Sequence, residues 1–558
     1  MIAVLLSALI SLILFLITGF AFSKLFKFSN GLTEKILLGL VLSNTTTSFL
    51  SIFFAININV LAILLLGCFF LAFYIKNEIF QCFSLLYNKR KIVFAGLPLV
   101  FIALLISVGP PLNWDTGLYH LQAIKWIEAY AVVPGLANLH GRFGFNPNIF
   151  TLFSLTSLSK LFGQEIFSLN FLLFSVFVMH FVNKLYINFK EESISNYFIF
   201  NLLIFVTILN LSDNLSSPSP DFISLSFPLF IFSYLTKTYA VSDQHNAKHY
   251  PTILILSIYI ITVKLATLPI LLLAILMYAT HSFNKRELLI LIPLLTLILA
   301  PWLIRNIILS GWLIYPFPLI DLFNFDWKVQ LAQVQLEKLL ITGFARSHGQ
   351  QNEAAYYMDI VEWFPMWWHG LTRNYKIIFL AATIFPVFLF TQNLFKKVKM
   401  NFGTLVVVIS SFIGVLFWFI RAPDFRFGKG FVVIAALTPL LYYQFKIHVY
   451  WEPNFKKMLP FLLFMGMLIL YYAGTNTGLN VVRIAKENIG RAITPELINV
   501  PDSIQFKSYM IGNVEIFVPT VEDRCFNHPL PCTGYSDTTL ELRGKFIQEG
   551  FKNGKPKM

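Results

Sequence analysis

Charged residues are scarce in this sequence. Only 13% of its 558 residues are Asp, Glu, Lys or Arg, whereas 57% are hydrophobic. A soluble globular chain has about 25% charged residues, so this chain has too little polar surface to cover a water-soluble particle of its size. The scarcity of charge excludes a soluble globular protein and requires that lipid cover part of the surface.

The sequence also lacks a basic patch, although its formal net charge is +14. Lys and Arg stand between apolar segments rather than in one cluster, so they indicate membrane topology and exclude nucleic acid as a partner. The first apolar run, residues 1–22, lacks a charged leading segment and a small-residue cleavage site. This run predicts a retained first span rather than a signal peptide.

Long apolar runs dominate what is present, and they predict an all-α polytopic membrane protein with about 12–14 transmembrane helices. A short interruption at Lys264 makes one pair of runs shorter than the rest. The predicted spans are 2–21, 35–54, 58–75, 93–109, 167–185, 195–212, 220–236, 250–264, 266–281, 288–309, 376–394, 403–420, 430–445 and 458–474.

Lys and Arg follow every second span, which orients the chain by the positive-inside rule. The segments that carry them are predicted to be cytoplasmic, and both chain ends are then outside. The long outer segments are 110–166, 310–375 and 475–558, and short outer turns lie at 212–220 and 421–429. The cytoplasmic cations are Lys24, Lys27, Lys76, Lys89, Arg90, Lys91, Lys184, Lys190, Lys237, Lys248, Lys285, Arg286, Lys396, Lys397, Lys399, Lys446, Lys456 and Lys457.

The outer segments contain two amphipathic patterns and a small tail. Residues 116–130 and 327–341 place apolar residues at helical spacing, which predicts helices lying flat on the membrane surface. Alternation over 509–519 predicts a β-hairpin, so the tail is expected to be α+β. Outside the cytoplasm, Cys525 and Cys532 are expected to form a disulfide. A zinc site with His528 is the alternative, although it lacks a fourth ligand.

Asp115 begins the first outer segment, where a span ends and a surface helix starts. As a helix N-cap it would bond free N–H groups; as a general base it would take a proton from an acceptor hydroxyl or amine. His120 could face the same cleft or the lipid headgroups. Further along, His140 and Arg142 lie among aromatics and turn formers, which fits either a solvated loop or a sugar site.

Several ionisable residues near the outer ends of other spans complete the candidate site. Asp221 opens a span, where N-capping is again the simpler interpretation. Each cation could snorkel to headgroups, but the positive-inside rule does not place cations outside, so together they indicate a phosphate-bearing ligand. These cations are Lys264, Arg305, Arg421 and Arg426.

The order of these motifs resembles the polytopic lipid-phosphosugar-dependent glycosyltransferases of the GT-C type, which include the protein O-mannosyltransferases and the bacterial aminoarabinose transferase acting on lipid A. That superfamily has an acidic residue early in a large first outer loop, followed by an aromatic-rich helix, and Asp115, Tyr119 and Trp126 match this arrangement. The further matches are Asn146-Pro147 leading to Lys160-Leu161-Phe162-Gly163, Pro220-Asp221, Lys264 to Pro269, Pro301 to Asn306 with Gly311 and Tyr315-Pro316-Phe317, and Arg426-Phe427.

The resemblance covers residues 93–445 and departs from the family in places. Three spans precede the acidic loop instead of one, the acidic pair is Asp115 followed by Thr116, and the tail is not a large soluble domain. It implies N-terminal transmembrane helices (1–92), a glycosyltransferase-like transmembrane core (93–474) and an extracytoplasmic tail (475–558).

The resemblance implies transfer of a sugar from a polyprenyl-phosphate-linked donor to an extracytoplasmic lipid, glycan or protein acceptor. The transfer is expected to invert the anomeric configuration and to take place at the inner (plasma) membrane. Asp115 would be the catalytic base. The residues expected to bind substrate are Tyr119, His120, His140, Arg142, Asp221, Lys264, Arg305, Arg421 and Arg426. No cofactor is indicated, although a divalent metal is compatible with the sequence. The absence of a nucleotide-binding Gly-rich loop disfavours a nucleotide sugar. The alternatives are a transporter or flippase, or a polymerase, of lipid-linked glycans; transporters usually show repeats and midplane charges, which are not seen here.

Overall fold

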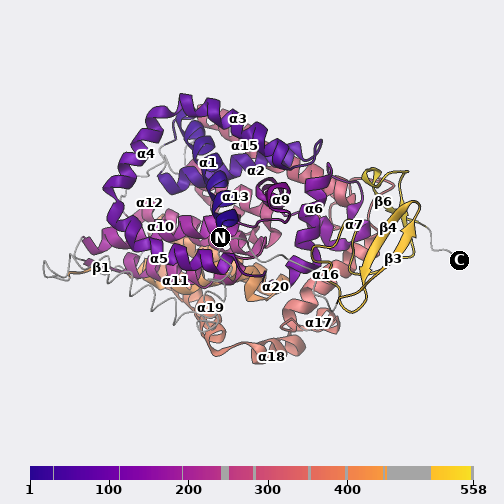
Figure 1. The fold of residues 1–558 in the computed structure, drawn as a ribbon. Helices are drawn as coiled ribbons and strands as arrows, with labels where there is room; N and C mark the ends of the chain where they lie inside the picture. The colour runs from indigo at the N-terminus through magenta and orange to yellow at the C-terminus, as the bar shows by residue number, and fades with distance from the viewer. Residues whose placement is uncertain are drawn as a thin grey trace.

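The computed structural model describes residues 1–28, 31–111, 113–190, 193–240, 250–280, 285–349, 353–395, 400–443, 446–448 and 504–554. Helices make up most of the chain, and the tail strands lie at one end of the helical body beside α6, α7 and α16 (Figure 1). The predicted span 458–474 lies outside the described residues, as do Lys248, Lys396, Lys397, Lys399, Lys456 and Lys457.

The helices follow one another with short connections in the first half of the chain. The first are α1 (Ile2–Leu25), α2 (Leu32–Leu50), α3 (Ile58–Tyr74), α4 (Lys76–Asn88) and α5 (Arg90–Ser107). The next segment contains η1 (Thr116–His120), α6 (Leu121–Ala129), α7 (Leu136–Leu139), η2 (Gly141–Phe145), α8 (Phe150–Thr156) and α9 (Ser159–Phe162). Then come α10 (Leu169–Lys190), α11 (Asn196–Leu209), η3 (Ser212–Asn214), α12 (Asp221–Ala240), α13 (Tyr250–Val263), η5 (Leu265–Thr267), α14 (Ile270–Thr280) and α15 (Lys285–Ser310).

The second half contains α16 (Leu331–Arg346), α17 (Ala354–Tyr357), α18 (Ile360–Gly370), α19 (Arg373–Leu394), α20 (Phe402–Arg421), α21 (Phe425–Leu437) and α22 (Pro439–Tyr442). Three antiparallel strand pairs complete the described chain: β1 (Ser193–Ser195) with β2 (Lys446–His448), β3 (Phe506–Ile511) with β4 (Val514–Pro519), and β5 (Leu540–Leu542) with β6 (Phe551–Asn553). The short helix η6 (Ile547–Glu549) precedes β6.

The predicted helical, multi-pass class agrees with these elements. Each predicted span up to residue 445 coincides with a helix or, for the last of them, with α21 and α22. Among the described residues, seven helices are long and apolar enough to cross a membrane, or up to eight if the bent pair α3 and α4 counts as one. These seven are α1, α5, α10, α11, α15, α19 and α20, and α12 and α13 are shorter apolar helices.

Segments predicted to lie outside the membrane contact one another. The turn between α2 and α3 meets the first outer loop, where the Val132 N–H donates to the Ser51 carbonyl at 2.9 Å. The Asn138 amide of that loop donates to the carbonyl of Trp327 in the 310–375 segment at 2.9 Å. Trp367 Nε1 of the same segment donates to the Pro423 carbonyl in the 421–429 turn at 2.6 Å. The predicted outer segments named here are therefore in contact with one another.

Segments predicted to be cytoplasmic also meet one another. Lys24 Nζ at the end of α1 donates to the Tyr74 carbonyl at the end of α3, at 2.6 Å. Lys89, which precedes α5, donates to the Asn183 side chain in α10 at 3.2 Å. Strand β1 after α10 pairs with β2 after α22. The alternation of sides used to order the spans is thus consistent with the packing.

The two predicted surface helices differ from expectation. Residues 116–130 form η1 and α6, but Leu121 and Ile124 are fully buried against protein, mainly α8. The apolar face of this helix is thus covered by protein, and the prediction that it lies flat on the membrane is wrong. In the second predicted pattern, residues 327–341, the helix α16 begins only at Leu331. Val329 and Val334 are buried, whereas Leu331 is exposed. The predicted single apolar face is therefore divided.

The tail contains the predicted hairpin, with strands β3 and β4 paired from Phe506 to Pro519. Cys525 and Cys532 are joined as a disulfide. The tail packs on the first outer loop, since the Phe551 N–H donates to the Pro134 carbonyl at 3.0 Å and the Phe526 N–H donates to the Gly117 carbonyl at 2.9 Å. The tail thus covers η1, the turn that begins directly after Asp115.

Candidate active site

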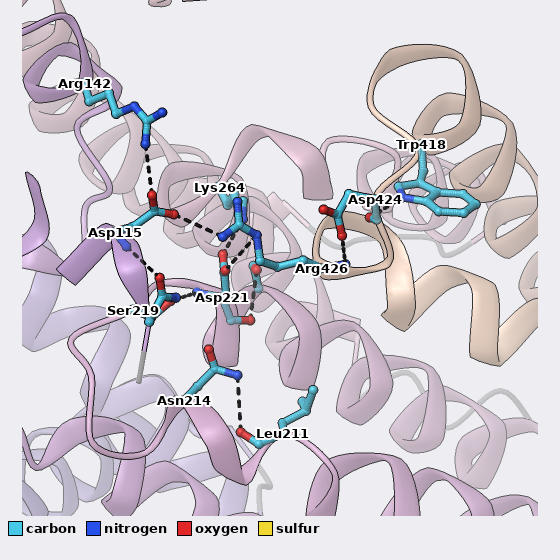
Figure 2. Close-up of polar contacts among 12 residues, drawn as sticks. Asp115, Arg142, Leu211, Asn214, Ser219, Asp221, Lys264, Trp418, Asp424 and Arg426 are labelled. Carbon is cyan, nitrogen blue, oxygen red and sulfur yellow. Dashed lines mark hydrogen bonds and ion pairs between the residues drawn. The ribbon is translucent and has the colours of Figure 1, made fainter. Parts of the chain in front are cut away.

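Asp115 stands at the start of the π-helical turn η1, and its side chain makes no capping hydrogen bond there. Oδ1 accepts a hydrogen bond from Arg142 Nη1 at 2.9 Å, and Oδ2 accepts one from Arg426 Nη1 at 3.1 Å. The N-cap interpretation of Asp115 is therefore wrong. Its carboxylate instead faces two guanidinium groups (Figure 2).

Asp221 begins α12, and its carboxylate is only 6% exposed. Its Oδ1 accepts a hydrogen bond from Lys264 Nζ, and Oδ2 lies 3.7 Å from Arg426 Nε. The break between α13 and η5 places Lys264 here, where its Nζ also lies 4.4 Å from the ring centroid of Phe427. The carboxylate of Asp221 thus takes part in ion pairs rather than in a simple helix cap.

Arg426 lies between the two carboxylates and connects them (Figure 2). Asp424 fixes its backbone, because Asp424 Oδ1 accepts a hydrogen bond from the Arg426 N–H at 2.8 Å and caps α21. Trp418 Nε1 in turn donates to the Asp424 carbonyl at 2.6 Å. Arg426 Nε is buried and has no hydrogen-bond partner within the described chain. This Nε atom is shielded from solvent and faces the Asp221 carboxylate, so a ligand would reach the guanidinium through its exposed part.

The five charged side chains form what we call the Asp115 cluster: Asp115, Arg142, Asp221, Lys264 and Arg426. Two carboxylates face three cations, so the cluster carries one excess positive charge. The side chains of Arg142 and Arg426 are 32% and 34% exposed. An anion could thus reach the cations while a carboxylate stands beside it, an arrangement suited to general-base chemistry with an anionic leaving group.

A repeated local turn holds four of these five residues. In each case the backbone N–H donates to the side chain two positions earlier, as in Asx and Ser/Thr turns. The pairs are Asp115 with Asn113, Arg142 with His140, Asp221 with Ser219, and Arg426 with Asp424. Asn113 also donates to Ser219 Oγ at 3.1 Å, which joins two of the turns. The sequence interpretation missed Asn113, Ser219 and Asp424.

The two predicted histidines are buried rather than solvated. Burial lowers the pKa of His120 to about 4, so its ring is neutral, and Nδ1 has no partner within the described residues. Burial and the charge of Arg142 lower the pKa of His140 to about 3. The His140 ring lies between Phe143 and Tyr535. Of the two alternatives for each histidine, the headgroup position for His120 and the solvated loop for His140 are therefore wrong.

Tyr119 is buried beside the cluster, with its ring 5.8 Å from the guanidinium carbon of Arg142.

The sequence interpretation did not single out Glu337 of α16, which also lies near Arg142. A Cβ on Gly141 would lie 2.1 Å from Glu337 Oε1, so only glycine allows this carboxyl to lie so close to the η2 turn. Burial raises the pKa of Glu337, although the charge of Arg142 opposes that rise.

Arg305 and Arg421 are not part of the cluster. Arg421 is exposed at the end of α20, and its carbonyl accepts a hydrogen bond from Thr342 Oγ1 at 3.2 Å. Arg305 is buried, where Nε donates to Asn146 Oδ1 at 3.0 Å and Nη1 donates to Ser51 Oγ at 2.6 Å. The prediction that Arg305 and Arg426 bind one phosphate together is therefore not supported by their positions.

Two of the motifs that resemble the glycosyltransferases bind each other. Asn146 has a left-handed backbone (φ 47°), which asparagine tolerates better than most residues. Its Nδ2 donates to the Trp302 carbonyl at 3.1 Å and to Asn306 Oδ1 at 2.9 Å, and its carbonyl accepts a hydrogen bond from Trp302 Nε1. The Asn146-Pro147 turn is thus fixed onto α15.

Within the described ranges, no group of three or more His, Cys, Asp or Glu side chains could hold a metal ion.

Comparison with curated proteins and with solved structures found no match. A family model described as Domain of unknown function (DUF8201) matches residues 1–433, which include the whole Asp115 cluster. The chain therefore belongs to the DUF8201 family.

Proposed function

We propose that this chain is a membrane glycosyltransferase that moves a sugar from a polyprenyl-phosphate-linked donor to an extracytoplasmic acceptor. The observation that carries the proposal is the position of Arg426 between Asp115 and Asp221. A carboxylate able to act as a base and a cation able to bind a leaving phosphate are then neighbours in one site, so both can reach the same bound donor and acceptor.

The donor phosphate would bind to the accessible cations. The side chains of both Arg142 and Arg426 are partly exposed. Guanidinium groups bind phosphate through charge-assisted hydrogen bonds. A phosphate on Arg426 would also draw that guanidinium away from Asp115, which would make the carboxylate more basic. Donor binding would thus prepare the base.

The chemical step is a single displacement at the anomeric carbon. Asp115 takes the proton of the acceptor hydroxyl or amine, whose oxygen or nitrogen forms the new bond to the sugar. The bond between the anomeric carbon and the phosphate oxygen breaks, and its electron pair leaves on the polyprenyl phosphate, where the cations stabilise it. One in-line attack inverts the configuration. The proposal assigns no cofactor to this step.

For the membrane arrangement we propose about 12–14 spans in the inner (plasma) membrane, with the Asp115 cluster on the periplasmic or extracellular side. The distribution of Lys and Arg supports this orientation. The contacts among the first outer loop, the 212–220 turn and the 421–429 turn also support it, since all three contribute to the cluster or its supporting turns.

The test uses the full chain in liposomes with a panel of radiolabelled polyprenyl-phosphate sugars and a cell-envelope extract as acceptor source. We expect release of polyprenyl phosphate and transfer of label, both lost in Asp115→Asn. A flippase would move the lipid between leaflets with the sugar still attached. Leaflet movement without bond cleavage would therefore overturn the proposal in favour of a flippase, and repeated additions to one acceptor would indicate a polymerase.

A further inference from the structure

A hollow lies beside the first outer loop, next to the Asp115 cluster. It opens to solvent, and its space, including the part open to solvent, is about 450 Å³. Its lining comes from α6, the 130–150 segment and α15. Most of the lining is apolar. The aromatic side chains among the lining are those of Trp126, Tyr130, Phe143 and Phe150, and the charged ones are those of Arg142 and Arg305.

Arg305 is a buried cation whose charge is compensated by no carboxylate among the described residues. It is 3% exposed, and its hydrogen bonds go to the neutral side chains of Asn146 and Ser51. No ion pair to Arg305 occurs within the described part of the chain. Burying a charge without a counter-charge is costly, so an anion in this hollow would compensate it.

Trp126 supplies a second, independent indication. It is 2% exposed, and its Nε1 is a buried donor without a hydrogen-bond partner in the described structure. Leaving a buried donor unbonded also costs free energy. Because the residues Trp126, Arg142 and Arg305 all line this hollow, a ligand bound there would lie next to positive charge and close to this unbonded donor.

We propose that this hollow binds an anionic group, phosphate or carboxylate, that is attached to an apolar body. The positive and donor groups bind the anion, and the aromatic and aliphatic lining packs on the body. Resting on the proposed function, we assign this ligand to the acceptor. Arg142 lines the hollow and also donates to Asp115, so an anion held there brings a nearby hydroxyl or amine toward the base.

The experiment places a probe inside the hollow. The full chain is labelled with 5-fluorotryptophan at its ten Trp positions, and the ¹⁹F resonance that disappears in Trp126→Phe is assigned to Trp126. Hexyl phosphate and hexanoate are titrated as short amphiphilic anions, with hexanol as the neutral probe and inorganic phosphate as the bare anion. We expect the Trp126 resonance to shift saturably with an amphiphilic anion and not with hexanol.

The preferred probe identifies the group: hexyl phosphate indicates a phosphorylated acceptor, and hexanoate a carboxylated one. A shift with hexanol equal to that with both anions would overturn the proposal, because the hollow would then be merely apolar. Equal affinity for inorganic phosphate and hexyl phosphate would overturn the assignment of an apolar body.

Variants test the cation. Arg305→Gln should weaken hexyl phosphate binding about 10-fold or more, since a charge-assisted hydrogen bond is lost. Arg305→Lys keeps the charge and should retain most of the affinity, which covers a failure of the glutamine variant to fold. Arg426→Gln should leave the Trp126 shift in place. Loss of the shift in Arg426→Gln but not in either Arg305 variant would place the anion in the Asp115 cluster and overturn the proposal.

Trp126→Phe and Trp312→Phe form a matched pair. Trp126→Phe removes an unbonded N–H, so thermal stability should hold or rise while affinity by calorimetry falls. Trp312 Nε1 donates to the Val329 carbonyl at 3.0 Å, outside the lining. Trp312→Phe should therefore lower stability and leave affinity unchanged, and the reverse pattern would contradict the role given to Trp126.

The assignment to the acceptor has its own kinetic test. Hexyl phosphate should inhibit turnover competitively with the acceptor, and competitive inhibition against the donor instead would overturn that assignment. The fluorine experiment needs neither donor nor turnover. Failure of the glycosyltransferase proposal would thus appear as absent transfer with an intact Trp126 shift, whereas failure of the anion site would appear as an absent shift.

Discussion

Asp115→Asn separates the chemical role of this residue from its structural role. Asparagine has nearly the same shape and keeps one oxygen as an acceptor for Arg142 or Arg426. Asp115 makes no capping hydrogen bond to η1, so the substitution removes none. What changes is the charge of the Asp115 cluster and its capacity to take a proton.

The two effects differ in size. Both ion pairs are part-buried, since the Asp115 side chain is only 16% exposed. The cost to the fold should therefore lie between that of losing exposed pairs and that of breaking a buried pair, roughly 1–3 kcal/mol. Loss of a general base costs about 10²–10⁴-fold in turnover. The excess positive charge of the cluster rises by one, so an anionic donor should bind at least as well as before.

The assay is release of polyprenyl phosphate in liposomes, with donor affinity and thermal stability measured on the same preparation. We expect a lower kcat and a KM for the donor within about threefold of wild type. Asp326→Asn is the control, because it removes an exposed carboxylate that pairs with Arg543 at 2.8 Å in the tail. Asp115→Asn that is folded and turns over at the wild-type rate would refute the assignment, and Asp221 would be the next candidate.

Three further predictions concern the tail, the pH dependence and the topology. Reduction of the Cys525–Cys532 disulfide should cost about 2–3 kcal/mol of local stability at most and raise deuterium exchange in α6. Two free thiols in protein purified without reductant would contradict the presence of this bond. Burial lowers the pKa of His120 to about 4, below its unfolded value of about 6.5. The unfolded state therefore binds the proton first, and stability should fall by about 3 kcal/mol as the pH drops from 6.5 to 4. His120→Gln should flatten the plot of unfolding temperature against pH, and an unchanged slope would refute the argument. Val521 in the tail and Tyr87 in α4 are well exposed. A membrane-impermeant maleimide should label Val521→Cys in intact cells, but should label Tyr87→Cys only after permeabilisation. The opposite pattern would show that the proposed orientation is reversed.

Hydropathy located the helices because a span must satisfy its backbone within the helix and present apolar side chains to lipid. The same signal could not say what covers an apolar face. Residues 116–130 have the pattern of a surface helix, but α6 buries Leu121 and Ile124 against α8. Protein and lipid are equally apolar partners, so periodicity alone does not distinguish them.

The candidate site was predictable in part for a related reason. Ionisable residues at the outer ends of spans are rare enough to be conspicuous, and this found Asp115, Asp221, Lys264 and Arg426. Arg142 was found by a different signal, as a cation among aromatics and turn formers in the first outer segment. The position of a residue within a predicted span indicates its depth in the membrane. It does not indicate which residues of other spans lie beside it at that depth. The sequence thus grouped Arg305 with Arg426, whereas the packing of α15 against Asn146 places Arg305 in a separate hollow.

A local signal for the cluster was nevertheless present in the sequence. Side chains that can accept a backbone hydrogen bond stand two residues before four of its members, as Asn113 stands before Asp115 and Asp424 before Arg426. Such turns fix the backbone of a charged residue before any long-range contact forms. The ion pairs then fix the ends of the side chains. Backbone and side-chain ends are thus held by different interactions, which is how a site keeps its charges in place ahead of ligand binding.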